Sequence, residues 1–300
     1  MTTPLNAKSR MEGIVIKGYS GFYYVQAQAT LWECSLRGRF RVHEQDFLPG
    51  DRVEISVLKG CKGVIEQVLP RRNSLIRPPI ANVEQTVIVL AHHSPEPDLN
   101  LLDRLLIQVE EAHVAPVICF NKADTASAHE IKSLESIYGD IGYKVISTGS
   151  GTEYGIAALK QELQGKVSVF AGPSGVGKST LVNAIQPGLA LKTGEVSRKL
   201  SRGRHTTRHV ELLPLEGGGF VADTPGFSSL NLPDMRREEL QNFFPELDKL
   251  ASDCKFSTCL HWQEPQCAVK AGLEQGMIYG GRYANYLLFL QEVIEHERRY

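Results

Sequence analysis

The sequence predicts a multidomain protein: an N-terminal OB-fold β-barrel, a central α/β domain and a C-terminal helical segment. Three observations predict this architecture. Short β-type runs fill residues 11–70, continuous apolar runs alternate with helical patterns from residue 85 onward, and cysteines cluster near the end of the chain. A shift from alternating to continuous apolar runs is typical of a change from a barrel to a buried parallel sheet. We place the domain boundaries at 1–77, 78–233 and 234–300.

Composition sets limits on the class of protein. The chain has 300 residues, of which 42% are hydrophobic and 22% charged, as in an ordinary globular protein with room for several cores. A net charge of −1 restricts any nucleic-acid surface to a local patch. No apolar run approaches the roughly 20 residues that span a bilayer, and the first residues lack the apolar core of a signal peptide. We therefore expect a cytoplasmic protein that does not bind membranes.

The first domain reads as a series of short strands. The expected strands are 13–16, 22–27, 31–36, 52–57 and 63–68, with Gly, Ser, Pro and Asp between them. Many short strands at this spacing are typical of a small barrel, and the OB-fold is a common RNA-binding example. Residues 1–77 carry 12 Lys and Arg against 7 Asp and Glu, which favours RNA contact. The interleaved aromatics are expected mainly to fill the core, with base stacking as the alternative: Phe22, Tyr23, Tyr24, Trp32 and Phe40.

The second domain begins after a stiff break at 77–80, where two prolines are adjacent. Apolar runs at 85–90 and 114–120 predict buried parallel strands, and leucines recur at helical spacing over 101–109. Asp98 and Asn100 precede that helix as candidate caps. A helix at 283–296 is expected in the C-terminal segment; within the second domain, further strands are expected at 144–146, 166–170 and 220–222, and helices at 155–163 and 178–185. This alternation predicts a doubly wound nucleotide-binding sheet.

A glycine-rich loop joins the expected strand at 166–170 to the next helix. Its residues are Gly172, Pro173, Ser174, Gly175, Val176, Gly177, Lys178 and Ser179, followed by Thr180. The glycines let backbone N–H groups surround phosphates, and the helix N-terminus adds partial positive charge. Lys178 is expected to reach the terminal phosphates and the Ser179 hydroxyl to bind Mg²⁺. The pattern predicts a P-loop.

A guanine-reading tetrapeptide precedes this loop. Asn121, Lys122, Ala123 and Asp124 follow the strand that ends at Phe120. The Asp124 carboxylate can accept hydrogen bonds from N1–H and the amine of guanine, a donor pair that adenine lacks. Alone, the tetrapeptide could be a helix-capping turn; beside a P-loop it predicts a GTP site. Ser147 and Thr148 are the expected backbone brace on the base.

A third element, Asp223-Thr224-Pro225-Gly226, follows both of these motifs. Asp223 is expected to hold Mg²⁺ and the Gly226 N–H to sense the γ-phosphate. Phe227 comes next, where many GTPases place a glutamine that orients water. In an ordinary GTPase the P-loop comes first and the Asn-Lys-x-Asp motif last. The reversed order predicts a circularly permuted GTPase that converts GTP to GDP and phosphate.

A basic loop upstream, residues 191–209, is the candidate source of the hydrolytic residue. Thr206 or Thr207 is the expected switch threonine for Mg²⁺, and His205 could position the attacking water. The alternative is that His205 is a solvated loop histidine with no catalytic part. The arginines of this loop could pair with RNA phosphates or simply be solvated.

The C-terminal cysteines have metal-ligand spacing. Cys254, Cys259, His261 and Cys267 supply three thiolates and an imidazole, a complete tetrahedral set for one structural zinc ion per chain. The alternative is a group of unliganded buried thiols. Glu264 could support the site or be merely exposed. Cys119 lies in an apolar run and is expected to be a buried reduced thiol.

These motifs together resemble the ribosome small subunit-dependent GTPase A family. The likeness is carried by the permuted order, the stretch Gly203–Thr207, the stretch Asp223–Phe227 and the Cys3His spacing, and it covers nearly the whole chain. It implies a factor in late maturation of the small ribosomal subunit that binds its rRNA and hydrolyses GTP slowly unless the subunit stimulates it. We expect the protein to be a monomer. It also implies a catalytic role for His205.

Two other functions are compatible with the motifs. One is a non-ribosomal regulatory GTPase, such as an RNA-modification or metal-insertion factor. The other is a non-enzymatic RNA-binding module that uses the nucleotide only to fold. Stimulation of hydrolysis by the small ribosomal subunit separates these possibilities.

Overall fold

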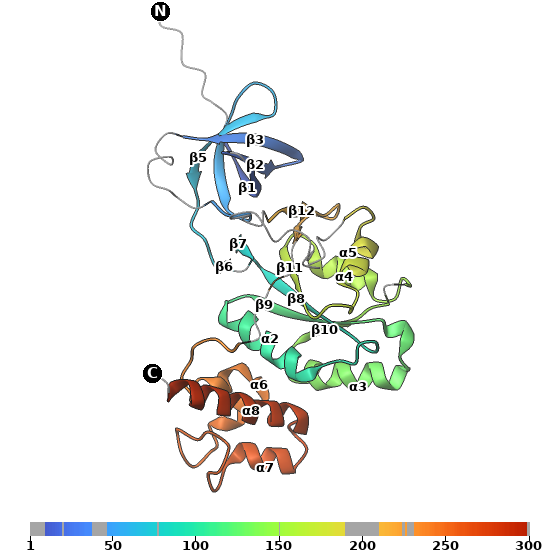
Figure 1. Cartoon of the computed structure of the whole chain (residues 1–300), viewed down its shortest axis with the longest axis vertical. Helices are drawn as coiled ribbons and strands as arrows, with labels where there is room; N and C mark the ends of the chain where they lie inside the picture. Colours follow the sequence, from blue (N-terminus) through green and yellow to red (C-terminus); the bar gives the residue numbers. More distant parts are fainter. Residues whose placement is uncertain are drawn as a thin grey trace, which may run out of the picture. The chain divides into compact units, whose positions relative to one another are not determined.

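The structure, a computed structural model, describes residues 10–19, 21–37, 47–76, 78–149, 151–189, 210–223, 226 and 231–298. Within these residues it contains a closed barrel, a six-stranded sheet flanked by helices, a two-stranded sheet and a C-terminal group of helices (Figure 1). The chain forms two compact units. The first comprises residues 1–85, 163–170 and 186–226, and the second comprises 86–162, 171–185 and 227–300.

The N-terminal strands close into a barrel in the order β1-β2-β3-β5-β4, which confirms the predicted fold of this region. Alternate side chains point inward and form a fully buried core that includes Val15, Val25, Ile55 and Ile65. The strands are β1 (Arg10–Tyr19), β2 (Phe22–Ala27), β3 (Thr30–Leu36), β4 (Arg52–Val57) and β5 (Lys62–Val68). Each predicted strand is present and within a few residues of its expected bounds.

The barrel aromatics divide between core and surface. Tyr23 and Trp32 pack against the barrel core, as does Phe47. Phe22, by contrast, is exposed, and Tyr24 lies beneath the ammonium group of Lys17, 5.3 Å from it. Core filling and surface exposure therefore both occur, following the alternation along β2. Phe40 is outside the described residues.

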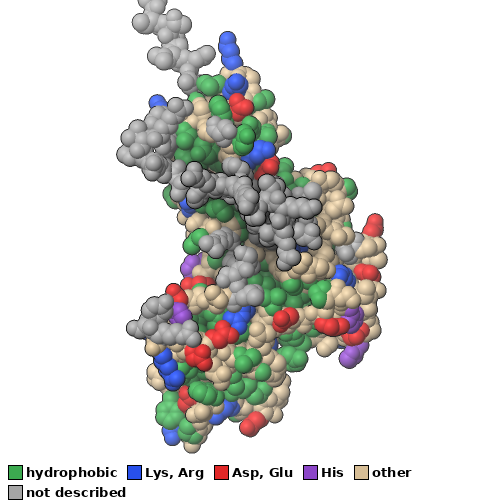
Figure 2. Space-filling model, in the orientation of Figure 1, with side chains coloured by type: hydrophobic (Ala, Val, Ile, Leu, Met, Phe, Trp, Pro, Cys, Tyr) green, Lys and Arg blue, Asp and Glu red, His purple; other side chains and the backbone are tan. Residues whose placement is uncertain are grey.

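Much of the positive charge of the barrel is balanced locally. Arg52 pairs with Glu12 at 2.8 Å, Lys62 with Glu33 at 3.9 Å and Arg37 with Glu66. Basic and acidic side chains both lie on the face of the barrel that Figure 2 shows. Exposed pairs of this kind are worth about 0–1 kcal/mol. The net charge of the domain is therefore a weak guide to where RNA would bind.

The proline pair at the expected break lies in a hairpin. Strand β6 (Ser74–Ile76) pairs antiparallel with β7 (Pro79–Ala81), with Ile76 opposite Pro79. Proline is tolerated here because it begins a short strand and need not donate to a ladder on both sides.

The central sheet has six strands in the order β10-β9-β8-β11-β13-β12. Strand β9 runs parallel to β10 and β11 parallel to β13, whereas β12 is antiparallel to β13. The strands are β8 (Gln85–Ala91), β9 (Ala115–Asn121), β10 (Lys144–Ser147), β11 (Val167–Ala171), β12 (Leu212–Pro214) and β13 (Phe220–Ala222). The predicted buried runs are confirmed. Strand β12 was not predicted, because three residues that end in proline carry no periodic signal.

Helices cover both faces of this sheet, with α2 and α3 on one face and α4 and α5 on the other (Figure 1). They are α2 (Leu99–Glu111), α3 (Ala128–Gly139), α4 (Ile156–Leu163) and α5 (Lys178–Ile185). Asp98 caps α2 by accepting from the Leu101 N–H, as predicted; Asn100 instead donates to the Asn285 side chain. Helix α3 was not predicted, because Tyr138 is its single buried residue. Strand order reverses between β8 and β11, which is where such sheets bind ligands.

The C-terminal helices pack around an apolar core of their own. The elements are η2 (Leu240–Phe243), α6 (Pro245–Ala251), α7 (Ala268–Glu274) and α8 (Gly280–Glu297). Phe244, Leu247, Phe289 and Leu290 are buried together, and Ile107 of α2 joins them. The C-terminal segment is thus docked on α2. In the described part of the chain, every helix is too short or too polar to cross a membrane.

A buried ion-pair cluster fixes this docking. The Arg282 side chain is 2% exposed; it donates to Asp103 of α2 at 2.5 Å and to Glu246 of α6 at 2.6 Å. Tyr138 donates to the same Asp103 oxygen at 2.9 Å. Burial by itself lowers the pKa of Arg282, but the carboxylates of Asp103 and Glu246 outweigh it and raise that pKa above its ordinary value. Arg282 is therefore charged and ties three helices together.

Removing this charge should destabilise the second unit strongly. Arg282→Met leaves Asp103 and Glu246 buried without a counter-charge, so we expect a loss of about 3–5 kcal/mol in the free energy of unfolding. Arg236→Met is the matched control, because Arg236 forms an exposed pair with Glu239 and should cost no more than about 0.5 kcal/mol. Urea denaturation followed by circular dichroism measures both. Equal midpoints for the two variants would refute the role given to Arg282.

Candidate nucleotide site and metal centre

The P-loop follows β11 and leads into α5, as predicted. Gly172, Gly175 and Gly177 all have positive φ angles, of 125°, 83° and 93°. At Gly172 a Cβ atom would lie 2.1 Å from the Val89 carbonyl oxygen, so only glycine fits this approach to β8. The Lys178 ammonium donates to the carbonyls of Gly172 at 2.8 Å and Pro173 at 2.6 Å, and burial lowers its pKa. Two carbonyl groups of the loop therefore face the Lys178 ammonium group.

The predicted guanine motif, Asn121–Asp124, is hydrogen-bonded to the P-loop. The Asn121 side chain is buried and donates to the Val176 carbonyl at 2.8 Å, while its oxygen accepts from the Thr148 hydroxyl at 3.1 Å. Lys122 donates to the Gly175 carbonyl at 2.9 Å. Asn121 and Lys122 therefore lock three separate segments together: the P-loop, their own motif and the stretch after β10.

The Asp124 side chain has a different setting, because it is exposed rather than buried. Gly149 lies against it: a Cβ atom at Gly149 would be 2.9 Å from the Asp124 Oδ1 atom and 2.4 Å from the Thr152 hydroxyl. The Ala123 N–H donates to the Thr148 carbonyl at 3.0 Å, which fixes the distance between the two loops. The carboxylate is thus positioned by its neighbours and open to a ligand.

Sequence reasoning missed two contributors from the loop after β8. The Ser94 carbonyl accepts a hydrogen bond from Lys122. His92 is buried, with Nε2 3.4 Å from the Ser147 hydroxyl and its ring against Phe120. Burial lowers the pKa of His92, which favours the neutral ring. Their place in the sequence could have identified them, because they directly follow strand β8. Strand β8 is the neighbour of β9, and ligands of such sheets bind at the carboxyl ends of the strands.

Asp223 and Gly226 lie in the first compact unit. Asp223 directly follows β13 and is 2% exposed; its N–H donates to the Glu211 carbonyl and its Oδ1 accepts from the Glu211 N–H, both at 2.9 Å. The Gly226 N–H donates to the Phe170 carbonyl at 2.9 Å. Glu211, just before β12, was not singled out from the sequence. The predicted residues His205, Thr206 and Thr207 lie outside the described residues, as do Thr224, Pro225 and Phe227.

Cys254, Cys259, His261 and Cys267 converge in the C-terminal segment, with all ligand atoms within 4.8 Å of one another. The Cys254 sulfur is 3.8 Å from the Cys267 sulfur and 3.6 Å from the His261 Nδ1, which is 3.4 Å from Cys267. Metal–sulfur bonds of about 2.3 Å in a tetrahedron give sulfur–sulfur edges of about 3.8 Å. The donor set and its spacing therefore fit a tetrahedral metal ion.

The surroundings hold these ligands in position. The His261 Nε2 atom lies 2.6 Å from the Gln241 side-chain oxygen, which leaves Nδ1 to face the sulfurs. Tyr283 donates to the His261 carbonyl at 2.7 Å. Glu264 accepts from the backbone N–H groups of Leu260 and Trp262, both at 2.9 Å, so it shapes the ligand loop rather than standing free.

Comparison with known proteins identifies the family. Residues 68–233 match the family described as RsgA GTPase, and residues 12–65 match the RsgA N-terminal domain. A protein from Moorella thermoacetica named small ribosomal subunit biogenesis GTPase RsgA is 54% identical over 290 residues, covering 97% of this chain and 100% of that protein. This chain belongs to the RsgA GTPase family. A protein of the same name from Carboxydothermus hydrogenoformans is 49% identical, covering 96% of this chain and 99% of its own length.

Two solved structures resemble the RsgA-family fold of this chain over nearly its whole length. The crystal structure of YjeQ from Thermotoga maritima is 37% identical, covers 95% of this chain and 99% of its own, and has a TM-score of 0.83. The structure of YloQ, a circularly permuted GTPase, is 38% identical with coverages of 98% and 99% and a TM-score of 0.82. The predicted permuted GTPase fold is confirmed, and the chain is a GTPase.

Proposed function

We propose that this chain is a GTPase that acts in late maturation of the small ribosomal subunit, binds small-subunit rRNA and is stimulated by the subunit. The observation that carries the proposal is the 54% identity to a small ribosomal subunit biogenesis GTPase over 97% of this chain. The barrel and the C-terminal segment are both covered by this similarity, so the shared function includes more than nucleotide binding.

We assign GTP binding to the two motifs of the second unit that are hydrogen-bonded to each other, the P-loop and Asn121–Asp124. Asp124 reads guanine, while Asn121 and Lys122 hold the base loop on the P-loop and Ser147 and Thr148 brace it. Phosphates take the place of the loop carbonyls as partners of Lys178, because an ammonium group binds phosphate oxygens more strongly than neutral carbonyls. Residues 172–180 supply the backbone N–H groups.

Magnesium is the second component that we assign to the nucleotide site. When bound, Mg²⁺ neutralises charge that develops on the phosphates. Its proposed ligands are the Ser179 hydroxyl, Asp223 through water, and Thr206 or Thr207. Asp223 is buried and its Oδ1 is held by the Glu211 N–H, so its carboxylate has a defined orientation.

Hydrolysis is assigned to His205, which positions the attacking water as a general base. Phe227, the residue after Gly226, has no hydrogen-bonding group and leaves this task to another side chain. The proposal for His205 rests on its place in the sequence, between the arginines of the basic loop and Thr206.

We assign one structural zinc ion to the four C-terminal ligands. Three thiolates and one imidazole are the donors that zinc prefers, and four protein ligands leave no position for a reactive water. We further propose that the protein is a cytoplasmic monomer with domains at 1–77, 78–233 and 234–300.

The test is the rate of GTP hydrolysis with and without isolated small ribosomal subunits. We expect stimulation of at least about tenfold, equivalent to about 1.4 kcal/mol in the activation barrier. His205→Ala should lower the stimulated rate by about 10²–10⁴-fold, the range of general acid–base catalysis, without weakening GTP binding. His129→Ala, an exposed histidine on α3, is the control and should keep the full rate.

Each rival function gives a different result in this assay. A non-ribosomal GTPase would hydrolyse GTP at one rate with or without subunits. An RNA-binding module that uses the nucleotide only to fold would show no hydrolysis in either condition. A stimulated rate that survives His205→Ala would leave the function intact and remove the catalytic role of His205.

A further inference from the structure

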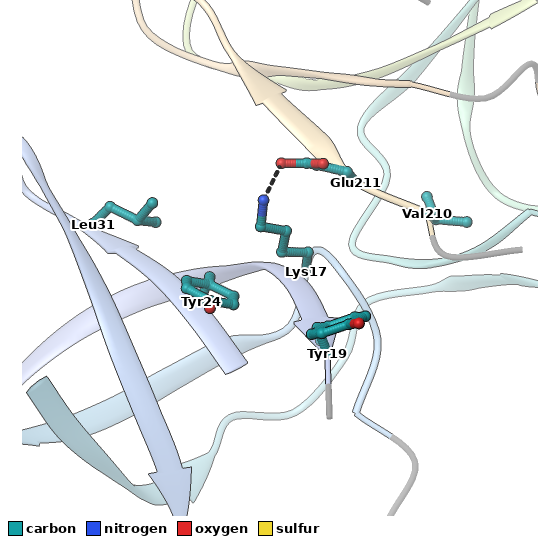
Figure 3. A pocket seen from close by; sticks show the side chains of 7 residues that line it. Lys17, Tyr19, Tyr24, Leu31, Val210 and Glu211 are labelled. Carbon is teal, nitrogen blue, oxygen red and sulfur yellow. Dashed lines mark hydrogen bonds and ion pairs between the residues drawn. The ribbon is translucent and has the colours of Figure 1, made fainter. Parts of the chain in front are cut away.

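A pocket of about 360 Å³ opens on the outer face of the barrel, within the first compact unit (Figure 3). Its size is at the lower end of the range for small-molecule sites, about 300–1,000 Å³. Strands β1, β2 and β3 supply one wall and the residues before β12 supply the other. The lining residues are Lys17, Gly18, Tyr19, Tyr24, Leu31, Val210 and Glu211.

A β-bulge aims Lys17 into this pocket. Val15 pairs with Val25 in the barrel core, and the register then shifts so that Lys17 pairs with Tyr24. In a regular strand Lys17 would share the face of Val15, inside the core, because side chains alternate. The extra residue, Ile16, reverses the alternation and turns Lys17 outward. The position of this cation is thus built into the strand.

The ion pair in the pocket joins two distant parts of the chain. The Lys17 ammonium lies 2.7 Å from the Glu211 carboxylate, although the two residues are 194 positions apart. The other pairs described above, formed by Arg37, Arg52 and Lys62, use carboxylates of the barrel itself. Glu211 therefore adds to the barrel surface an acceptor that the barrel does not supply.

The pocket combines stacking surfaces with a donor and an acceptor. In Figure 3 the ring of Tyr24 lies on one side of the Lys17 chain and that of Tyr19 on the other. Tyr19 is 63% exposed and Leu31 43% exposed. Aromatic rings of this kind stack on unpaired bases, and the face of strands 2–3 is a usual oligonucleotide surface of OB-fold barrels.

We infer that this pocket takes one unpaired guanine base of an RNA strand, stacked on the tyrosines, with O6 facing Lys17 and its N–H donors facing Glu211. Guanine carries the acceptor O6 beside N1–H and the N2 amine, the order that an adjacent ammonium and carboxylate match. Uracil has no amine and presents a second carbonyl to the carboxylate. The inference rests on the proposed RNA-binding function.

One residue, Glu211, connects this pocket with Asp223, the predicted magnesium ligand. The main chain of Glu211 exchanges two hydrogen bonds of 2.9 Å with Asp223, while its side chain lines the pocket and pairs with Lys17. A base that displaces Lys17 from Glu211 acts on the residue that orients Asp223. Glu211 thus lines the pocket with its side chain and hydrogen-bonds Asp223 through its main chain.

The test measures binding of the full-length protein to two labelled single-stranded RNAs, an oligouridine 12-mer and the same 12-mer with one central guanosine. Saturating GDP fills the nucleotide site throughout. We expect the guanosine to tighten binding about 5- to 100-fold, the range for one correctly read base. Glu211→Gln should reduce this preference, and Tyr24→Leu should weaken guanosine binding about 5- to 150-fold. Lys62→Met, which removes an exposed barrel cation, should keep the preference.

Equal binding of the two RNAs by the wild-type protein would overturn the inference, as would a full preference in both Glu211→Gln and Tyr24→Leu. Thermal melting followed by circular dichroism tests whether each variant is folded. If Tyr24→Leu is unfolded, Glu211→Gln still tests the inference, because glutamine has nearly the same shape as glutamate. Stimulation of wild-type hydrolysis by small ribosomal subunits is measured in parallel. Stimulation without a guanosine preference would contradict only the inference about the pocket. Absence of stimulation would contradict the proposed function.

Discussion

Cys254→Ser is expected to abolish metal binding and to unfold the C-terminal helices. Structural zinc sites contribute about 10–16 kcal/mol of apparent binding free energy, as much as the whole stability of an ordinary domain, about 5–15 kcal/mol. Cys259 and Cys267 are part of the buried core with Phe244 and Phe289, so loss of the ion also disrupts packing. Elemental analysis should find one zinc per wild-type chain and none in the variant. The far-ultraviolet helical signal should fall.

The control for this experiment is Cys61→Ser, because Cys61 is an exposed thiol outside the cluster. It should retain one zinc and the wild-type melting temperature. A Cys254→Ser protein that lacks zinc but melts like the wild type would show that the apolar core holds the segment without metal. A wild-type protein without zinc would favour unliganded thiols.

Asp124→Asn should change the base specificity from guanine to xanthine. The variant loses two hydrogen bonds from guanine to a charged acceptor, each worth about 1.5–3 kcal/mol, so GTP should bind about 10²–10⁴-fold more weakly. Xanthosine triphosphate carries a carbonyl in place of the amine and can accept from the new amide, so its binding should improve. Calorimetric titration with both nucleotides measures the exchange.

Asp140→Asn is the control for base reading, since Asp140 is an exposed residue at the end of α3. It should bind GTP like the wild type. If Asp124→Asn kept its preference for GTP over xanthosine triphosphate, Asp124 would not be the residue that reads guanine. Asn121 and Lys122 are unsuitable for this test because they bond to the P-loop and their loss would disturb the fold of the site.

Motifs made of neighbouring residues were predictable from the sequence. The P-loop, the Asn121–Asp124 tetrapeptide and the Cys3His cluster each lie within a single short stretch of sequence, of at most 14 residues, so their grouping is visible without the fold. Continuous apolar runs likewise predicted strands β8, β9 and β11, because a strand that is buried on both faces of a sheet contains few polar residues. Elements without such a signal were missed, including α3 with its single buried residue and the three-residue strand β12.

The sequence by itself thus determined the permuted GTPase core of this protein and the Cys3His cluster that could hold a metal ion. Tertiary structure decided which distant residues meet. The Arg282 cluster joins α2, α6 and α8, His92 reaches Ser147 across the sheet, and Lys17 meets Glu211 through a bulge. Such contacts have no sequence signature, because a single charge or histidine on an element looks solvated until another element packs against it.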